Sequence, residues 1–266
     1  MTPRSTTWQP VPILMYHAVE DETREPKYKH FYVTRAEFEW QMRALSRGGY
    51  TPIGFGQLAR ARIDGVLPAR PVILTFDDGY ENLVTNVYPM LRDLAWSYTV
   101  FLVSERIGRT NEWVVPEGYE ATPLLSWPQI REMSAHSLVD FQPHTATHPR
   151  LDSLDDSALR RELRDSRDSL AQNLQKEMDV LCYPYGSHND RVVDAARETG
   201  YKMAVTTDFG RVRRDDDPLR LPRISVYHVP PVSLTYGIGT LNFDWRLRTR
   251  RDNRPLPPAR VGDVFK

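Results

Sequence analysis

The sequence is poor in the features that mark several classes of protein. It contains a single cysteine, Cys182, among 266 residues, so no disulfide can form within the chain. No stretch approaches the roughly 18 consecutive apolar residues of a transmembrane helix, and we expect no stable insertion in a membrane. Neither sign of charge is in excess, because 35 basic side chains balance 35 acidic ones. The composition therefore gives no overall field that would attract nucleic acid.

The first ten residues also lack the apolar segment of a secretory signal. The protein could be cytoplasmic, or it could be exported with its signal removed. The sequence does not define the oligomeric state. A content of 40% hydrophobic and 26% charged residues predicts one folded domain with a sizeable core. We expect an N-terminal extension over 1–10, a catalytic domain over 11–245 and a poorly ordered basic Pro/Arg-rich tail over 246–266, whose arginines are a solvated terminus.

Short apolar runs alternate with helical patterns along the chain, which is typical of βα units around a parallel sheet. Strands are expected at 11–16, 71–76, 98–103, 138–141, 180–183, 203–206 and 223–227, and helices at 34–47, 80–94, 126–133, 153–174 and 190–199. Residues 105–123 form a loop insertion that we expect to overhang the site. Seven or eight such units predict an α/β fold, a distorted or incomplete (β/α) barrel of about seven strands.

The most informative motif is Thr75-Phe76-Asp77-Asp78-Gly79, which follows the apolar run at 71–74. Two adjacent carboxylates at the end of a buried strand are costly there unless they are used. A metal ion can neutralise one of them, and a reaction that needs a base can use the other. We therefore expect Asp78 to bind a metal and Asp77 to act as a general base.

A histidine pair lies downstream, in His144-Thr145-Ala146-Thr147-His148. Together with Asp78, its two imidazoles give one carboxylate and two nitrogen ligands, with positions left for water and substrate. An ion there would lower the pKa of a bound water and polarise a carbonyl oxygen.

Two further residues come directly after predicted strands, where barrel enzymes build their active sites. His17 is the candidate for the general acid that an amine or alcohol leaving group needs. A backbone N–H near Tyr185, in Tyr183-Pro184-Tyr185-Gly186, could help to hold a tetrahedral oxyanion. Trp113, Tyr119 and Trp127 are candidates for a sugar-binding groove, with core packing as the plainer explanation of Trp127.

Each motif alone has a plainer explanation. Asp-Asp-Gly is most often a turn, a lone His-x-x-x-His is usually on the surface or at a cap, and Pro-Tyr-Gly is a turn. A lone His17 would be a buried histidine. Their joint occurrence at successive strand ends favours the functional interpretation.

These residues resemble the polysaccharide deacetylases of carbohydrate esterase family 4, the NodB-homology domain, over roughly residues 11–230. The resemblance implies that Asp77 is the base and that Asp78, His144 and His148 bind the metal. The opening Leu14-Met15-Tyr16-His17 and the form of Tyr183-Pro184-Tyr185-Gly186 look like the poly-N-acetylglucosamine deacetylase branch, which is involved in biofilm exopolysaccharide. In that branch the motifs are circularly permuted and the last histidine comes from the first strand, which supports His17 as the acid.

The sequence differs from the family pattern in the third and fourth motifs. The family usually has an arginine two positions before the proline of Pro-Tyr-Gly, where this chain has Cys182. Since that arginine orients the base, its loss puts the tuning of Asp77 in question. The Asp-rich fourth motif is not recognisable, and Asp208 is a weak stand-in.

The resemblance implies a divalent-metal hydrolase that removes N-acetyl groups from an N-acetylglucosamine-type glycan, with zinc as the first expectation and cobalt, nickel or manganese as alternatives. Three other functions stay open at this point: removal of O-acetyl groups from xylan or another polysaccharide, hydrolysis of a cyclic amide by metal-free relatives, and a non-catalytic glycan-binding domain that keeps a structural metal.

Overall fold

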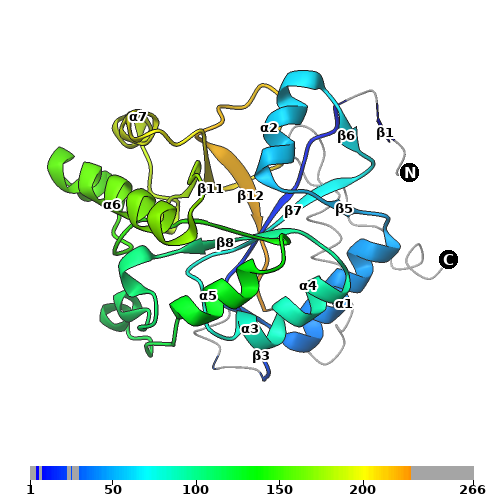
Figure 1. Ribbon diagram of the computed structural model, residues 1–266, viewed down its shortest axis with the longest axis horizontal. Helices are drawn as coiled ribbons and strands as arrows, with labels where there is room; N and C mark the ends of the chain where they lie inside the picture. The colour runs from blue at the N-terminus through cyan, green and yellow to red at the C-terminus, as the bar shows by residue number, and fades with distance from the viewer. Residues whose placement is uncertain (1–3, 6–7, 23–24, 26–29, 229–266) are drawn as a thin grey trace.

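The computed structural model describes residues 4–5, 8–22, 25 and 30–228 of the chain (Figure 1). The predicted tail over 246–266 lies outside the described residues, as do residues 1–3 and 6–7 of the predicted N-terminal extension. The three-part division of the chain therefore stays a prediction.

Seven parallel strands form a barrel-shaped sheet in the order β10-β11-β12-β2-β7-β8-β9. Their bounds are β2 Ile13–Tyr16, β7 Pro71–Phe76, β8 Tyr98–Leu102, β9 Val139–Pro143, β10 Val180–Cys182, β11 Met203–Phe209 and β12 Leu221–Ser225. The short β5 (Thr51–Pro52) branches off β7. Two small sheets pair β1 (Arg4–Ser5) with β6 (Leu67–Pro68) and β3 (Ala18–Glu20) with β4 (Tyr32–Thr34).

The barrel is nearly closed, with one seam between β9 and β10. No strand ladder joins these two edges in the described part of the chain. Instead, the side-chain oxygen of Gln142 on β9 accepts hydrogen bonds from the backbone N–H groups of Asp179 and Val180, at 3.2 and 3.1 Å. The prediction of an incomplete barrel of about seven strands is confirmed.

The first barrel strand in the sequence lies in the middle of the sheet. Leu14 of β2 is in register with Ile224 of β12 on one side and with Leu74 of β7 on the other. The residue that follows β2, His17, is thereby brought beside the residues that follow β7.

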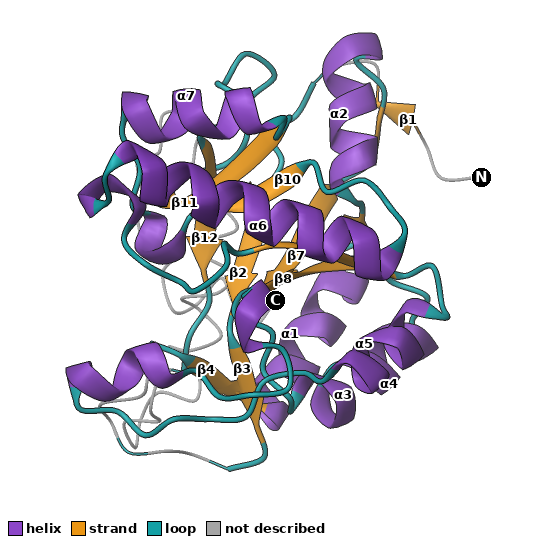
Figure 2. Cartoon of the chain, turned by 60° about the vertical axis from the view of Figure 1, so that its left-hand side comes forward, coloured by secondary structure: helices purple, strands orange, loops and turns teal. Residues whose placement is uncertain are grey.

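Helices cover the outside of the barrel in two groups (Figures 1 and 2). One group comprises α1 (Arg35–Arg47), α3 (Leu83–Asn86), α4 (Tyr88–Asp93) and α5 (Trp127–Ser134), which share an apolar cluster with β2, β7 and β8. The other comprises α6 (Asp156–Leu174) and α7 (Asp190–Thr199), packed on β10 and β11. Phe55 and Leu58 of α2 (Phe55–Asp64) join a third cluster with Ile13 and Ile73 of the strands.

Local signals explain where the helices begin. The predicted capping boxes of Thr34 with Glu37 and of Ser126 with Gln129 are present at the starts of α1 and α5. The single helix predicted at 80–94 is instead two short helices, because Pro89 stands in the first turn of α4, where its missing N–H costs nothing. Helix α2, which the sequence analysis did not predict, lies between Gly54 and Gly65. No helix among the described residues is long and apolar enough to cross a membrane.

Candidate metal and catalytic site

The predicted site residues follow the carboxyl ends of four barrel strands. Asp77 and Asp78 follow β7, His144 follows β9, His17 follows β2, and Tyr185 lies in the turn η5 (Pro184–Gly186) after β10. A hydrogen bond from the Asp77 N–H to the carbonyl of Tyr16, at 2.9 Å, ties the ends of β2 and β7 together.

The side chains of Asp78, His144 and His148 converge into a buried group. The Asp78 Oδ1 atom lies 3.4 Å from Nε2 of His144 and 3.3 Å from Nε2 of His148. All three residues are buried, and Asp78 Oδ1 has no hydrogen-bond donor among the described residues. A buried carboxylate oxygen without a donor is costly, and a cation in this position would satisfy it.

The histidine rings are oriented with Nε2 toward Asp78. The Nδ1 atom of His144 lies 2.8 Å from the backbone carbonyl of Cys182, and since a carbonyl only accepts, Nδ1 carries the proton and Nε2 is free to bind a metal. Burial lowers the pKa of His148, which favours the neutral ring that a metal ligand requires. Burial alone would raise the pKa of Asp78, but the electrostatic attraction of the adjacent His144 and His148 rings outweighs burial and holds the pKa well below its usual range, so the carboxylate is ionised.

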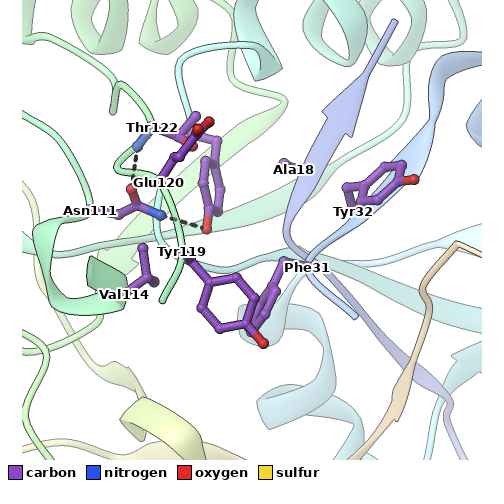
Figure 3. A pocket seen from close by; sticks show the side chains of 9 residues that line it. Ala18, Phe31, Tyr32, Asn111, Val114, Tyr119, Glu120 and Thr122 are labelled. Atoms are coloured by element: carbon purple, nitrogen blue, oxygen red, sulfur yellow. Dashed lines mark hydrogen bonds between the residues drawn. The ribbon is translucent and has the colours of Figure 1, made fainter. Parts of the chain in front are cut away.

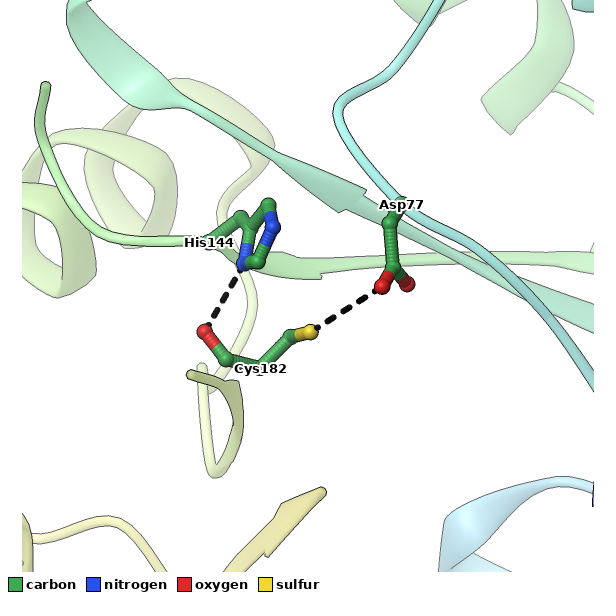
Figure 4. A group of neighbouring side chains, drawn as sticks. All are labelled: Asp77, His144 and Cys182. Atoms are coloured by element: carbon green, nitrogen blue, oxygen red, sulfur yellow. Dashed lines mark hydrogen bonds between the residues drawn. The ribbon is translucent and has the colours of Figure 1, made fainter. Parts of the chain in front are cut away.

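This donor set fits a divalent cation. One carboxylate oxygen and two imidazole nitrogens suit zinc, and they suit cobalt, nickel or manganese as well, so the ligand types do not select the ion. Asp77, His144 and Cys182 also lie close enough to share an ion (Figure 4). That second group fits poorly, because burial raises the pKa of the Cys182 thiol and Asp77 is already neutralised by an arginine.

The arginine is Arg223 of β12, a residue that the sequence analysis did not single out. Its guanidinium donates to both carboxylate oxygens of Asp77, each at 2.7 Å, in the two-pronged geometry that binds carboxylates most strongly. Burial alone would raise the pKa of Asp77, but the charge and hydrogen bonds of Arg223 outweigh it and the pKa is lowered. Asp77 is therefore an ionised carboxylate at neutral pH.

His17 and Tyr185 border this group. His17 is half-buried and lies close enough for a positive charge on its ring to lower the pKa of both Asp77 and Asp78. The ring of Tyr185 meets His148 edge-on, with ring centres 4.7 Å apart, and the guanidinium of Arg150 lies 4.5 Å above it. Tyr185 has a left-handed backbone (φ 58°), and a Cβ atom on the following Gly186 would lie 2.9 Å from the backbone nitrogen of Thr207. The turn that presents Tyr185 therefore requires glycine at 186.

The insertion at 105–123 borders the site, as expected. Trp113 in η3 (Glu112–Glu117) stacks on His148, with ring centres 4.4 Å apart. Tyr119 packs against Phe31, whose ring in turn meets His17. Tyr119 and Phe31 also line a small pocket with a mixed apolar and polar lining (Figure 3). Trp113 and Tyr119 thus contact the site or its border, while Trp127 packs against the core.

Two weaker candidates are not brought to the site. The carboxylate of Asp208 is mostly exposed and lies 4.0 Å from Nε2 of His188. His228 contacts Glu37 at the start of α1 and stacks on Tyr32, so its contacts are with β4 and α1.

Comparisons with known proteins agree with this geometry. A sequence profile described as "Polysaccharide deacetylase" matches residues 64–204, which is more than half of the chain. The chain belongs to the polysaccharide deacetylase family. Membership implies a hydrolase that acts on an acetylated glycan.

The relatives of this deacetylase include a poly-beta-1,6-N-acetyl-D-glucosamine N-deacetylase of Staphylococcus epidermidis, which is 28% identical over 206 residues, or 74% of this chain and 69% of its own length. Among solved structures, the Streptococcus pyogenes deacetylase PplD in complex with acetate is 28% identical, with a TM-score of 0.70 over 82% of this chain and 94% of its own. IcaB from Ammonifex degensii shares the fold, with a TM-score of 0.70 over 91% of this chain and 98% of its own at 23% identity.

Proposed function

We propose that the protein hydrolyses N-acetyl groups of an N-acetylglucosamine-type polysaccharide. The observation that carries the proposal is the division of labour between two adjacent carboxylates. Asp78 Oδ1 faces two imidazole nitrogens and has no hydrogen-bond donor in the described part of the chain, whereas Asp77 is held by Arg223. The similarity to a poly-beta-1,6-N-acetyl-D-glucosamine N-deacetylase supports the choice of substrate.

Each residue has a role in this proposal. Asp78, His144 and His148 would hold the divalent cation, with zinc as the first expectation, and the ion would supply Lewis-acid polarisation of the amide carbonyl. Asp77 takes a proton from the attacking water; its Oδ1 atom still has a lone pair beyond the one that accepts from Arg223, whereas Oδ2 accepts from both Arg223 and the Cys182 thiol. The backbone N–H of Tyr185 donates to the oxyanion that forms on the carbonyl oxygen.

His17 completes the reaction. When the bond between the carbonyl carbon and the amide nitrogen breaks, His17 gives a proton to the departing amine, so that acetate and a free amino sugar result. An ester oxygen leaves more easily than an amine and needs less help from an acid. Strand register places His17 beside the residues that follow β7, and an acid at this position favours the amide over the O-acetyl ester.

The non-catalytic alternative loses one of its two supports. It rested on the missing arginine of the third motif and on the absent fourth motif, and Arg223 on β12 contacts Asp77 with a guanidinium from another strand.

The test is acetate release from N-acetylglucosamine oligomers by metal-stripped protein, with and without added zinc or cobalt, with acetylxylan in parallel. We expect release that depends on the metal and falls by about 10² to 10⁴-fold in Asp77→Asn, the contribution of a general base. Asp93→Asn, the same change at an exposed aspartate, serves as the control. Release from acetylxylan alone would favour the esterase, and no release from either substrate by metal-loaded protein would contradict the proposal.

A further inference from the structure

Arg223 is unusual among the charged residues of the protein because its side chain has no exposed surface. A buried guanidinium is costly unless its donors are paired. Its donors are all directed at neighbours: Nε at the carbonyl of Thr206 (2.8 Å), Nη1 at Asp77 Oδ1 (2.7 Å) and Thr75 Oγ1 (3.2 Å), and Nη2 at Asp77 Oδ2 (2.7 Å) and Cys182 Sγ (3.3 Å).

These contacts fix the direction of the Asp77 carboxylate. Two parallel N–H···O bonds define the plane of a carboxylate as well as its position. The bond to Thr206 anchors the guanidinium to β11, and the ring of Phe101 lies 6.0 Å from its central carbon. Asp77 is thus held against the sheet, whereas the neighbouring Asp78 is turned by a left-handed backbone (φ 70°) toward the histidines.

The position of Cys182 shows what this arrangement replaces. Cys182 stands where the third family motif has its arginine, and its Sγ atom contacts Asp77 Oδ2 at 3.5 Å and Nη2 of Arg223 at 3.3 Å. A side chain at 182 therefore points at the same carboxylate from β10. An arginine at 182 would compete with Arg223 for that space, and the small thiol leaves room for it.

We propose that Arg223 is the positioning residue of the base, supplying from β12 the guanidinium that the family motif supplies from position 182, and that a small residue at 182 is its necessary complement. This inference rests on the proposed function of Asp77 as the base. Arg223 acts through Asp77 and does not touch the metal-binding group.

The experiment compares Arg223→Met, Arg223→Lys, and Arg223→Met combined with Cys182→Arg, all loaded with zinc. Arg220→Met, the same change at a partly exposed arginine just before β12, is the control. The measurements are kcat and KM for acetate release, zinc content, melting temperature, and crystal structures that show the direction of the Asp77 carboxylate.

We expect kcat to fall by about 10²-fold in Arg223→Met, the size of effect that a misplaced reacting group produces, with KM and zinc content nearly unchanged. Arg223→Lys keeps the charge but loses the two-pronged contact, so its kcat should also fall, and this variant decides the matter if Arg223→Met does not fold. Adding Cys182→Arg should recover at least a ten-fold part of the loss and return a guanidinium to Asp77.

The inference is overturned if Arg223→Lys keeps the kcat of the unchanged protein, if zinc is lost in proportion to kcat, or if Asp77 keeps its direction in the crystal structure of an Arg223 variant. The crystal structures test the inference independently of activity, because they show directly whether the Asp77 carboxylate has changed its direction. An unchanged protein that releases no acetate would therefore count against the proposed function alone.

Discussion

Asp77 and Asp78 are neighbours in the chain, yet the two halves of the site around them are built in different ways. The Asp77 half is held by strands: Arg223 on β12 and Cys182 on β10 contact the carboxylate, and Thr75 on β7 accepts a hydrogen bond from the same guanidinium. The Asp78 half is held by loops, and three of its residues have left-handed backbones, with φ values of 70° at Asp78, 65° at Thr145 and 71° at His148.

The side chains of the two halves are therefore positioned by different kinds of interaction. Strand register places Arg223 and Asp77 without strained backbone. The histidine loop is held from outside by Glu162 on α6, whose carboxylate accepts from the backbone N–H groups of Ala146 and Thr147, each at 2.9 Å, and from the hydroxyl of Thr147. Left-handed backbone in non-glycine residues costs free energy and persists only where surrounding contacts impose it. The proposed metal half therefore depends on its clamp by Glu162, whereas the proposed base half is placed by strand register.

The comparison is tested most strongly by removing the two carboxylates in turn. Asp78→Asn should lose the bound metal and reduce kcat by about 10³-fold or more. This is the rate enhancement that corresponds to several kcal/mol of transition-state stabilisation by a Lewis acid. Asp77→Asn should lose activity but keep its metal. Metal stoichiometry after dialysis, measured by mass spectrometry, separates the two. Loss of metal from both variants would show that the halves are not independent.

Substitution of the two aspartates should also have different effects on the free energy of unfolding. In metal-free protein at pH 7, Asp77→Asn leaves the buried charge of Arg223 unpaired and should cost about 3–5 kcal/mol. The native pKa of Asp77 lies below its unfolded value, because the attraction of Arg223 outweighs burial. The ion pair is therefore fully stabilising above about pH 4, and its contribution is lost as the pH falls through the native pKa.

The deficit of Asp77→Asn relative to the unchanged protein should accordingly narrow below about pH 4. Asp78→Asn should cost less at pH 7, since its histidine neighbours can release a proton and leave no buried charge. Urea unfolding of the metal-free proteins at several pH values measures both effects. A deficit for Asp77→Asn that stays constant at low pH would contradict the assigned ion pair.

The clamp of the histidine loop gives a smaller effect. Glu162→Ala removes both carboxylate oxygens, so the backbone N–H groups of Ala146 and Thr147 lose their acceptor. Metal affinity should fall by about 10 to 100-fold, as is usual when a residue that orients metal ligands is changed. Glu198→Ala, at an exposed glutamate of α7, is the matched control. Competition with a chelator measures the affinity, and equal affinities of the two variants would argue against the clamp.

The smallest effect is expected at Trp113. The Nδ1 atom of His148 has no hydrogen-bond partner among the described residues, so this ring is held by packing against Trp113 and Tyr185. An aromatic pair contributes about 0.5–1.5 kcal/mol, so Trp113→Ala should weaken metal binding by no more than about ten-fold. Trp40→Ala, on the exposed face of α1, should leave it unchanged. A loss as large as that of a metal ligand would mean that Trp113 does more than pack.

The sequence predicted the parts of the site that lie in short motifs. The aspartate pair, the two histidines and His17 each follow an apolar run, and parallel strands bring their carboxyl ends to one edge. Arg223 could not be found in this way. Within Arg223-Ile224-Ser225-Val226 it looks like an outward-facing residue of an alternating strand, and its partner Asp77 is distant in the sequence. Only the barrel order, with β12 beside β2, makes the two neighbours.

Cys182 is a second case in which a contact distant in the sequence changes the interpretation of a local motif. Taken alone, the missing arginine of the third motif suggested a poorly tuned base. The structure corrects that expectation, because the same contact is made from a different strand. Helix α2 was missed for another reason: it holds its apolar residues Phe55, Leu58 and Ala61 against the core in only ten residues, among glycines and arginines that obscure the pattern.

The place of β2 between β7 and β12 also has a consequence for how the protein folds. The first barrel strand in the sequence, β2, must pair with β12, which follows it by about 200 residues. Contacts of such long sequence separation make folding slow. Because β12 is the last of the seven barrel strands and carries Arg223, Asp77 gains its guanidinium partner only when all seven strands are in place.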